Sequence, residues 1–313
     1  MTGKPVIVVG GPTASGKSGL ALQIARAFDG EIVNADSMQV YSDLKLVTAR
    51  PDARDEATVP HHLYGILGRG ERSSAGTWRK DALDVIAACH TSGKLPILVG
   101  GTGLYLRALM TGFHEIPDIP PDIRTRLNRR LETDGPSTLH GELAAVDQEM
   151  ALRLNPADGQ RIVRALEVFQ HTGRTLSDWQ TGEPVSAPGD LRFLTIVTAP
   201  PRDDLYNAID ARVERMIGAG AVEEVELFLA TDPQPDFPLL KAVGVLPISE
   251  FIEGTIDRDR MTELCKRDTR RYAKRQTTWF RNQIISEITI NMKLSQKTIG
   301  KTFPEISNFL LTP

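Results

Sequence analysis

The sequence predicts an α/β fold in which a parallel sheet is flanked by helices and an all-helical subdomain is inserted between two of its strands. Short, uncharged, β-branched runs, which are typical of buried parallel strands, alternate with amphipathic helical patterns over much of the chain. A glycine-rich loop separates the first such strand from the first helix. Strand signals stop from about residue 114 to residue 190, where the pattern is helical and polar. The 313 residues, of which 41% are hydrophobic, are enough for more than one folding unit.

The glycine-rich loop matches a phosphate-binding pattern. Gly11 is followed by four residues and then by Gly16-Lys17-Ser18, between a strand and a helix as the P-loop motif requires. Glycines let backbone N–H groups turn inward around an anion, Lys17 adds positive charge, and the Ser18 hydroxyl can hold Mg²⁺. We therefore expect a P-loop NTPase-like core that binds a phosphate or diphosphate, with Mg²⁺ as cofactor. The binding residues are Gly11, Pro12, Thr13, Ala14, Ser15, Gly16, Lys17 and Ser18.

Two polar residues follow predicted strands. The strands are expected at residues 5–9, 31–35, 94–99 and 191–197. Ligands of parallel α/β sheets bind beyond the carboxyl ends of the strands, so Asp36 and Thr102 are expected on the same rim as the P-loop. By position alone, Asp36 suits a metal ligand, a general base or a helix N-cap, and Thr102 suits a site residue or a helix cap.

Two further segments are rich in basic residues. The inserted stretch carries several arginines, among them Arg124, which a solvated helix face would also explain. Residues 265–281 contain seven basic residues and one acid, interleaved with aromatic side chains at helical spacing. Because the whole chain has a net charge of −3, this local stripe favours contact with a nucleic-acid backbone over a merely solvated face. Arg212 lies beside the apolar face of another predicted helix, residues 201–218.

The same patterns predict the domain organisation. Residues 1–113 and 191–285 form a discontinuous P-loop core domain, and residues 114–190 form an inserted helical domain. Residues 286–313 are polar and unpatterned, and we treat them as a C-terminal tail.

Composition limits the class of protein. Two cysteines form no disulfide framework, which suggests a reducing compartment, and the adjacent His61 and His62 suit local structure better than a metal site. The first strand begins by residue 5, which leaves no room for a signal peptide, and no apolar run is long enough to cross a bilayer. We expect a cytoplasmic monomer without membrane contact.

P-loops serve several enzyme classes, and two of these are disfavoured. A GTPase would need an Asn-Lys-x-Asp sequence after the P-loop, and a motor ATPase would need an apolar strand that ends in an acid. The third strand ends instead in Gly100-Gly101-Thr102. A small-molecule kinase fits these residues, with Asp36 orienting an acceptor hydroxyl and arginines in a mobile lid.

Six ordered motifs together resemble the tRNA dimethylallyltransferase family, in its bacterial form without a zinc-finger extension. The resemblance runs from the first strand to about Arg281. The motifs are GPTASGKS at 11–18, DSMQVY at 36–41, PHHL at 60–63, VGGT at 99–102, DGQR at 158–161 with RALE at 164–167, and AKRQTTW at 273–279. Two segments depart from the family pattern: residues 46–51 read LVTARP where IGTAKP is usual, and Gly65 stands where an acid is often found.

The resemblance implies transfer of a dimethylallyl group from dimethylallyl diphosphate to N6 of the adenosine just 3′ of the anticodon, in tRNAs that read codons beginning with U. It implies that Asp36 is the general base, that Thr102 bonds the target adenine and that Arg212 binds the diphosphate. The P-loop would hold the leaving diphosphate, and the inserted domain would grip the anticodon stem-loop. The expected tRNA contacts are Asp36, Ser37, Met38, Gln39, Thr102, Arg124, Gln160, Arg161, Ile162, Val163, Arg164, Arg270, Arg271 and Lys274.

Three alternatives share part of this pattern. An isopentenyltransferase acting on free AMP, ADP or ATP would keep the P-loop and Asp36 but would not need the insert or the basic helix. A P-loop kinase would consume ATP. A tRNA-binding protein with a vestigial P-loop would not need the intact Lys17-Ser18 pair.

Overall fold

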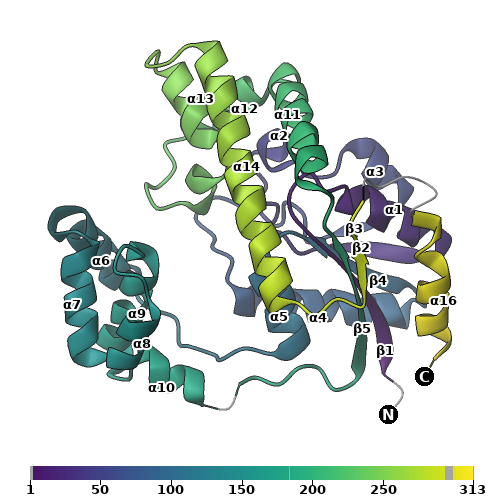
Figure 1. Cartoon of the computed structure of the whole chain (residues 1–313), viewed down its shortest axis with the longest axis horizontal. Coiled ribbons are helices and arrows are strands. Elements are labelled where there is room, and N and C mark those ends of the chain that lie inside the picture. Colours follow the sequence, from purple (N-terminus) through teal and green to yellow (C-terminus); the bar gives the residue numbers. More distant parts are fainter. Residues whose placement is uncertain (1–2, 183, 293–298, 313) are drawn as a thin grey trace. The chain divides into compact units, whose positions relative to one another are not determined.

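The computed structural model describes residues 3–182, 184–292 and 299–312 and divides the chain into two units (Figure 1). The first unit combines Met1–Thr111 with Pro188–Pro313, and the second is Gly112–Ala187. The second unit thus begins two residues before, and ends three residues before, the insert expected at residues 114–190. Within the described residues, no helix combines the length and the apolar character needed to cross a membrane.

The first unit is built on a parallel six-stranded sheet of order β3-β2-β4-β1-β5-β6. Its strands are β1 (Lys4–Gly10), β2 (Gly30–Asn34), β3 (His61–His62), β4 (Leu95–Gly100), β5 (Leu191–Thr198) and β6 (Ile288–Ile290). The central strand β1 pairs Val9 with Val99 of β4 and with Ile196 of β5. The four predicted strands are confirmed to within one residue at every boundary, and the two short edge strands were missed because two or three residues show no periodicity.

Helices cover both faces of this sheet, because successive side chains of a strand point to opposite sides. Val6 and Val8 of β1 pack in one core, and Ile7 and Val9 pack in the other. The first core includes side chains of α4 (Ala75–Thr91), α5 (Gly103–Thr111), α11 (Arg202–Gly218), α12 (Ala221–Leu229), α13 (Val245–Ile252) and α14 (Arg258–Gln283). The second includes α1 (Lys17–Ala27) and α16 (Phe303–Leu311). Burying each such valine or isoleucine contributes about 2 kcal/mol.

The described residues of the C-terminal segment, 286–292 and 299–312, contribute a strand and a helix to the first unit, which corrects the expectation that this segment is an unpatterned tail. β6 extends the sheet by pairing with β5, and Glu287 accepts the Thr195 N–H at 2.7 Å. Ile306 of α16 is fully buried, and Phe303 meets Phe28 edge to face with ring centroids 5.4 Å apart. Apolar residues at 299, 303 and 306 do follow helical spacing, but the segment is too short for that pattern to stand out.

The second unit is helical, as its sequence predicts. It comprises α6 (Pro121–Asp134), α7 (Pro136–Val146), α8 (Gln148–Arg153), α9 (Gly159–Thr172) and α10 (Leu176–Thr181) around a small apolar core. Asp158 caps α9 by accepting the Arg161 N–H at 3.3 Å. The buried Asp147 caps α8 and also accepts the Ser177 hydroxyl at 2.6 Å, which ties α8 to α10.

A buried carboxylate joins two helices of this unit. Glu167 of α9 has a side chain only 1% exposed, and it accepts hydrogen bonds from Arg124 of α6 and from Arg164 at 2.6 Å each. Burial raises the pKa of Glu167, but the bonds from the two arginines outweigh burial and hold the pKa below its usual value. Each guanidinium therefore has a structural role in addition to any contact with a ligand.

Replacing Glu167 by glutamine should destabilise the second unit by about 2 kcal/mol, because two charge-assisted hydrogen bonds are weakened in a buried place. Since the pKa is lower in the folded chain, the stabilisation is present above about pH 4.3 and is lost as the pH falls through the lowered folded value. Urea unfolding from neutral to acidic pH would measure both effects. The exposed Glu132 of α6 offers a matched control, and an equal loss in Glu132→Gln would contradict the prediction.

Candidate active site

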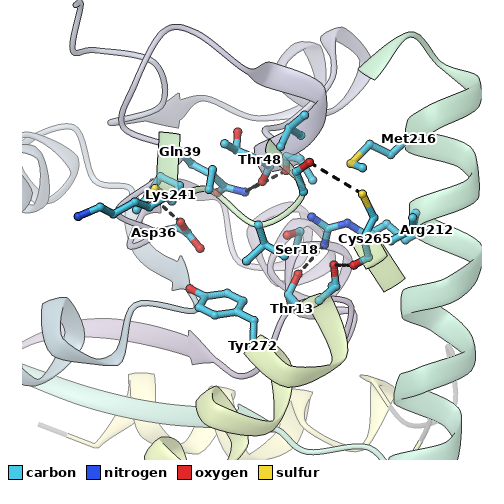
Figure 2. Close-up of a pocket in the computed structure, with 18 of the residues that line it drawn as sticks. Thr13, Ser18, Asp36, Gln39, Thr48, Arg212, Met216, Lys241, Cys265 and Tyr272 are labelled. Carbon is cyan, nitrogen blue, oxygen red and sulfur yellow. Dashed lines mark hydrogen bonds between the residues drawn. The ribbon is translucent and has the colours of Figure 1, made fainter. Parts of the chain in front are cut away.

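A pocket lies at the carboxyl ends of the central strands, between the P-loop and helices α11 and α14 (Figure 2). The P-loop contributes Thr13, Lys17 and Ser18, and Asp36 enters from the end of β2. The other lining residues include Met38, Gln39, Val47, Thr48, Ala49, Arg212, Val213, Met216, Cys265, Tyr272 and Arg275. The structure thus brings the P-loop, Asp36 and Arg212 together, as predicted.

The P-loop turns through backbone conformations that favour glycine. Gly11 has φ of 146°, and a Cβ there would lie 2.3 Å from Thr198 Oγ1 of β5. The Ser15 hydroxyl bonds the same Thr198 oxygen at 2.6 Å, which anchors the loop to the sheet. Gly16, with φ of 87°, begins α1 without a side-chain cap. Because the first N–H groups of a helix have no intrahelical partner, the start of α1 is open to an anion.

Two cations and one carboxylate share the pocket. Lys17 Nζ donates to the Pro12 carbonyl at 3.2 Å, and Arg212 Nη1 donates to the Thr13 hydroxyl at 2.9 Å. Burial lowers the pKa of Lys17 to about 8, the Asp36 charge opposes this shift, and the Arg212 charge adds to it. Burial also lowers the pKa of Arg212, again against the charge of Asp36. An anionic ligand would relieve the unfavourable burial of both cations.

Asp36 is held in place by its own strand. Its backbone N–H donates to Asn34 Oδ1 at 2.9 Å, and Asn34 Nδ2 donates to the Asp36 and Leu63 carbonyls. One carboxylate oxygen accepts the Met38 N–H at 3.0 Å within a turn, so Asp36 caps no helix, and that alternative is excluded. Within the described part of the chain the other oxygen, Oδ2, has no hydrogen-bond donor.

Thr102 joins the ends of two strands. Its hydroxyl accepts the Ser37 N–H at 2.9 Å and donates to the Ser37 hydroxyl at 3.2 Å, while its backbone N–H donates to the Ala35 carbonyl at 3.2 Å. The side chain is therefore directed at the residue that follows Asp36. Its hydrogen bonds couple the ends of β2 and β4.

The segment after β2 forms a wall of the pocket. Gln39 Nε2 donates to the carbonyls of Thr48 and Ala49 at 2.8 and 2.9 Å, and Glu224 of α12 caps the short helix α2 (Lys45–Thr48) at the Leu46 N–H. These bonds hold Val47, Thr48 and Ala49 against the pocket.

Two of the departures from the family pattern, Arg50 and Gly65, meet in space. Arg50 Nη1 donates to the Tyr41 carbonyl at 2.7 Å. A Cβ on Gly65 would lie only 2.0 Å from this same nitrogen, and Gly65 has φ of 61°. The guanidinium at residue 50 therefore occupies space that only a glycine at residue 65 leaves open.

Helix α14 supplies pocket residues that the sequence analysis did not single out. Tyr272 and Arg275 line the pocket, and the Arg275 guanidinium lies over the Tyr272 ring at 5.6 Å. Cys265 also lines it, and burial raises the pKa of its thiol to about 12. The sequence showed a basic stripe on this helix. Tyr272, Gln276 and Phe280 are spaced four residues apart, and this spacing indicates a second face of the helix that points inward.

The basic residues of α14 fall into two groups. Arg270 is paired with Asp210 of α11 through a 2.8 Å bond from Nε, and Lys266 is paired with Glu214 at 2.9 Å. Arg271 is 65% exposed and lies 3.8 Å from Asp268, whereas Lys274 forms no ion pair with any described residue. Of the three tRNA contacts predicted on this helix, Arg271 and Lys274 are therefore better placed for an outside partner than Arg270.

The predicted ligand contacts in the second unit are of mixed character. Gln160 and Arg161 are exposed at the start of α9. Ile162 and Val163 are buried in the apolar core of that unit, which corrects the expectation that these two side chains contact a ligand. The helical period turns them inward.

The adjacent histidines form β3, the strand at one edge of the sheet. His62 Nε2 lies 2.6 Å from Glu31 Oε2, and the buried Cys89 thiol donates to the same oxygen at 3.5 Å. The ligand atoms of these three residues lie within 4.8 Å of one another, so they could meet a metal ion geometrically. Each already has a hydrogen-bond partner in the trio, and together they attach β3 and α4 to β2.

Comparison with known proteins places this architecture in one family. The family model described as IPP transferase matches residues 39–283. A tRNA dimethylallyltransferase of Rhodospirillum centenum is 49% identical over 281 residues, covering 90% of each chain, and one of Paramagnetospirillum magneticum is 44% identical over 311 residues, covering 99% of this chain and 98% of the relative.

Two similar solved structures are transferases of the same kind as these relatives. A tRNA isopentenylpyrophosphate transferase of Bacillus halodurans superposes with a TM-score of 0.69 at 30% identity, covering 98% of this chain and 96% of that one. A eukaryotic dimethylallyltransferase described as acting on tRNA superposes with a TM-score of 0.75 at 26% identity, covering 97% and 80%. The P-loop, the acid at the end of β2 and the helical insert described above therefore belong to a member of the IPP transferase family.

Proposed function

We propose that this chain transfers the dimethylallyl group of dimethylallyl diphosphate to N6 of the adenosine just 3′ of the anticodon, in tRNAs that read codons beginning with U. The observation that carries the proposal is the convergence of Lys17, Arg212 and Asp36 on one pocket at the open start of α1. Membership of the IPP transferase family supports it. Such a pocket has cations for a leaving diphosphate and a base for an incoming amine.

The diphosphate would occupy the P-loop end of the pocket. As the allylic C–O bond breaks, its electron pair stays on the diphosphate, where negative charge grows. The N–H groups at the start of α1, Lys17 and Arg212 already face this position, so the site stabilises the charge without reorganising. The Thr13 hydroxyl holds the Arg212 guanidinium in place.

Magnesium fits the same end of the pocket. The Ser18 hydroxyl lines the pocket, has no hydrogen-bond partner among the described residues, and is a hard oxygen donor of the kind that Mg²⁺ prefers. Ser18 would hold the ion together with diphosphate oxygens and water. When bound, Mg²⁺ would neutralise part of the charge on the leaving group.

Asp36 would act on the acceptor. The exocyclic amine of adenine is a poor nucleophile, and it loses a proton as its new C–N bond forms. The free oxygen of Asp36 would take that proton, and the Thr102 hydroxyl would hydrogen-bond the base. A base in an anticodon loop must first leave its stack to reach such a pocket.

Apolar residues complete the pocket around the prenyl group. Val47, Val213 and Met216 line it near the two cations. An apolar wall matches a five-carbon allylic chain and limits access of water to the carbon that becomes electron-poor.

The tRNA itself would meet basic residues outside the pocket. Arg271 and Lys274 on α14, and Arg124, Arg161 and Arg164 of the second unit, would contact the anticodon stem-loop. Such contacts make binding salt-dependent. We also propose that the protein works in the cytoplasm as a monomer.

The direct test is incubation of the protein with Mg²⁺ and labelled dimethylallyl diphosphate, in parallel with tRNA, AMP and ATP as acceptors. Label in tRNA alone supports the proposal. Label in AMP or ATP would identify an adenylate isopentenyltransferase instead, and ATP turnover without any transfer would identify a kinase.

Asp36→Asn should lower kcat for transfer to tRNA by about 10²- to 10⁴-fold, because the variant cannot accept the amine proton. Binding of dimethylallyl diphosphate should stay the same or tighten, since a negative charge leaves the pocket. Single-turnover kinetics and calorimetry separate these effects. Asp84→Asn, which neutralises an exposed carboxylate on α4, is the matched control. A variant at Asp36 with wild-type kcat would rule out this base.

Binding of dimethylallyl diphosphate should weaken as the pH rises through about 8 in the free protein, because Lys17 then loses the proton that attracts the anion. Below that pH the lysine is charged and the affinity is greatest. Calorimetric titrations from about pH 7 to about pH 10 would locate the change. In Lys17→Arg, whose guanidinium stays charged, the inflection should vanish, and a flat wild-type profile would contradict the assignment.

A further inference from the structure

One side chain of α14 bridges the two halves of the site. Gln276 is only 6% exposed. Its Oε1 accepts the Thr13 N–H at 2.8 Å, and its Nε2 donates to the Gly101 carbonyl at 2.9 Å. Because one partner can only donate and the other can only accept, the orientation of the amide is fixed.

The helix reaches this position because three glycines leave space for it. A Cβ on Gly10 would lie 2.5 Å from Phe280 Cε1, one on Gly101 would lie 2.2 Å from Gln276 Nε2, and one on Gly103 would lie 1.9 Å from Trp279 Cζ3. Gly10 is the last residue of β1, and Gly101 and Gly103 follow β4; these two strands lead into the P-loop and into the turn with Thr102. The AKRQTTW segment and the two glycine-rich turns therefore form one packed contact.

The two ends of the bridge have different roles in the proposed reaction. Thr13 belongs to the P-loop, and its hydroxyl also holds Arg212, so this end sets the position of the diphosphate site. Gly101 precedes Thr102, whose hydroxyl bonds Ser37 next to Asp36, so the other end sets the position of the acceptor site. A single amide thus joins the two loops that must hold the donor carbon and the acceptor nitrogen within reach of each other.

We propose that Gln276 is a positioning residue: its amide fixes the P-loop and the turn that carries Thr102 at the separation needed for prenyl transfer. This inference rests on the proposed function and adds a residue to it. Because the Gln276 oxygen occupies the Thr13 N–H, and the Ser15 N–H donates to Pro12, the diphosphate must be bound by other N–H groups of the loop.

The test uses a substitution that breaks one end of the bridge. Gln276→Glu keeps an oxygen acceptor for the Thr13 N–H but places a second oxygen against the Gly101 carbonyl. The full chain is assayed by calorimetry with dimethylallyl diphosphate alone, and by kinetics with an unmodified anticodon stem-loop. Affinity for the diphosphate should fall a few-fold, because the new carboxylate lies beside the P-loop, while kcat/KM for the stem-loop should fall by a further factor of about ten or more.

Acidic pH supplies a readout that loss of packing would not give. A protonated glutamic acid has a donor and an acceptor, as the amide does. The ratio of variant to wild-type kcat/KM for the stem-loop should therefore rise as the pH is lowered, at unchanged melting temperature. Gln283→Glu, on the same helix but exposed, is the control and should show neither effect.

A second variant changes Gly101, the residue whose carbonyl accepts the Gln276 hydrogen bond. Gly101→Ala leaves Gln276 intact but places a methyl group where its Nε2 lies, so it should reproduce the selective loss toward the stem-loop even if Gln276→Glu does not fold. Wild-type kinetics in both variants, or an equal loss toward both substrates with no recovery at low pH, would overturn the proposal. Failure of the wild-type chain to modify tRNA would instead refute the proposed function.

Discussion

The site depends first on the backbone N–H groups at the start of α1, which can bind an anion. A helix start needs acceptors for its first N–H groups, and six of the described helices find one in a capping side chain, such as Asp158 before α9 and Asp257 before α14. The helix after the P-loop has none, because the residue before it is Gly16 in a left-handed conformation. Its donors and dipole are thereby left available to an anion, and Gly11 and Gly16 hold the positive φ values that side chains other than glycine adopt only with strain.

The site must also keep its two cations and its carboxylate close together without letting them form an ion pair. Lys17 and Arg212 face an acid, Asp36, across one pocket, yet neither cation forms an ion pair with Asp36 in the described structure. Both cations are held by neutral partners, Pro12 and Thr13. Asp36 is held by backbone groups of its own turn. Each charge is thus fixed by dipoles, which leaves the cations available to a diphosphate and the carboxylate available to an amine.

Helix α14 has one face packed inside the first unit and another face exposed on its surface. One face of α14 enters the rim of the sheet, where Gln276, Trp279 and Phe280 pack against three glycines. Another face carries the exposed Arg271 and Lys274. Glycines at the ends of β1 and β4 and the α14 segment that carries Gln276 are far apart in the sequence, and they meet at this one contact. Arg50 and Gly65 form a second contact of this kind, in which a large side chain depends on a residue without one.

The sequence alone determined the features that depend on neighbours along the chain. Buried strands such as Val6–Val9 have continuous apolar patterns, so the sheet and the position of Asp36 at its rim could be predicted. The spacing of the P-loop residues indicates phosphate binding, so this loop could be predicted as well. Tertiary structure decided what depends on distant residues: that β6 and α16 complete the core, and that Gln276 joins two loops. The reason is physical. Local patterns report how a segment can bury its own apolar face, whereas a single polar contact across 175 residues leaves no periodic trace.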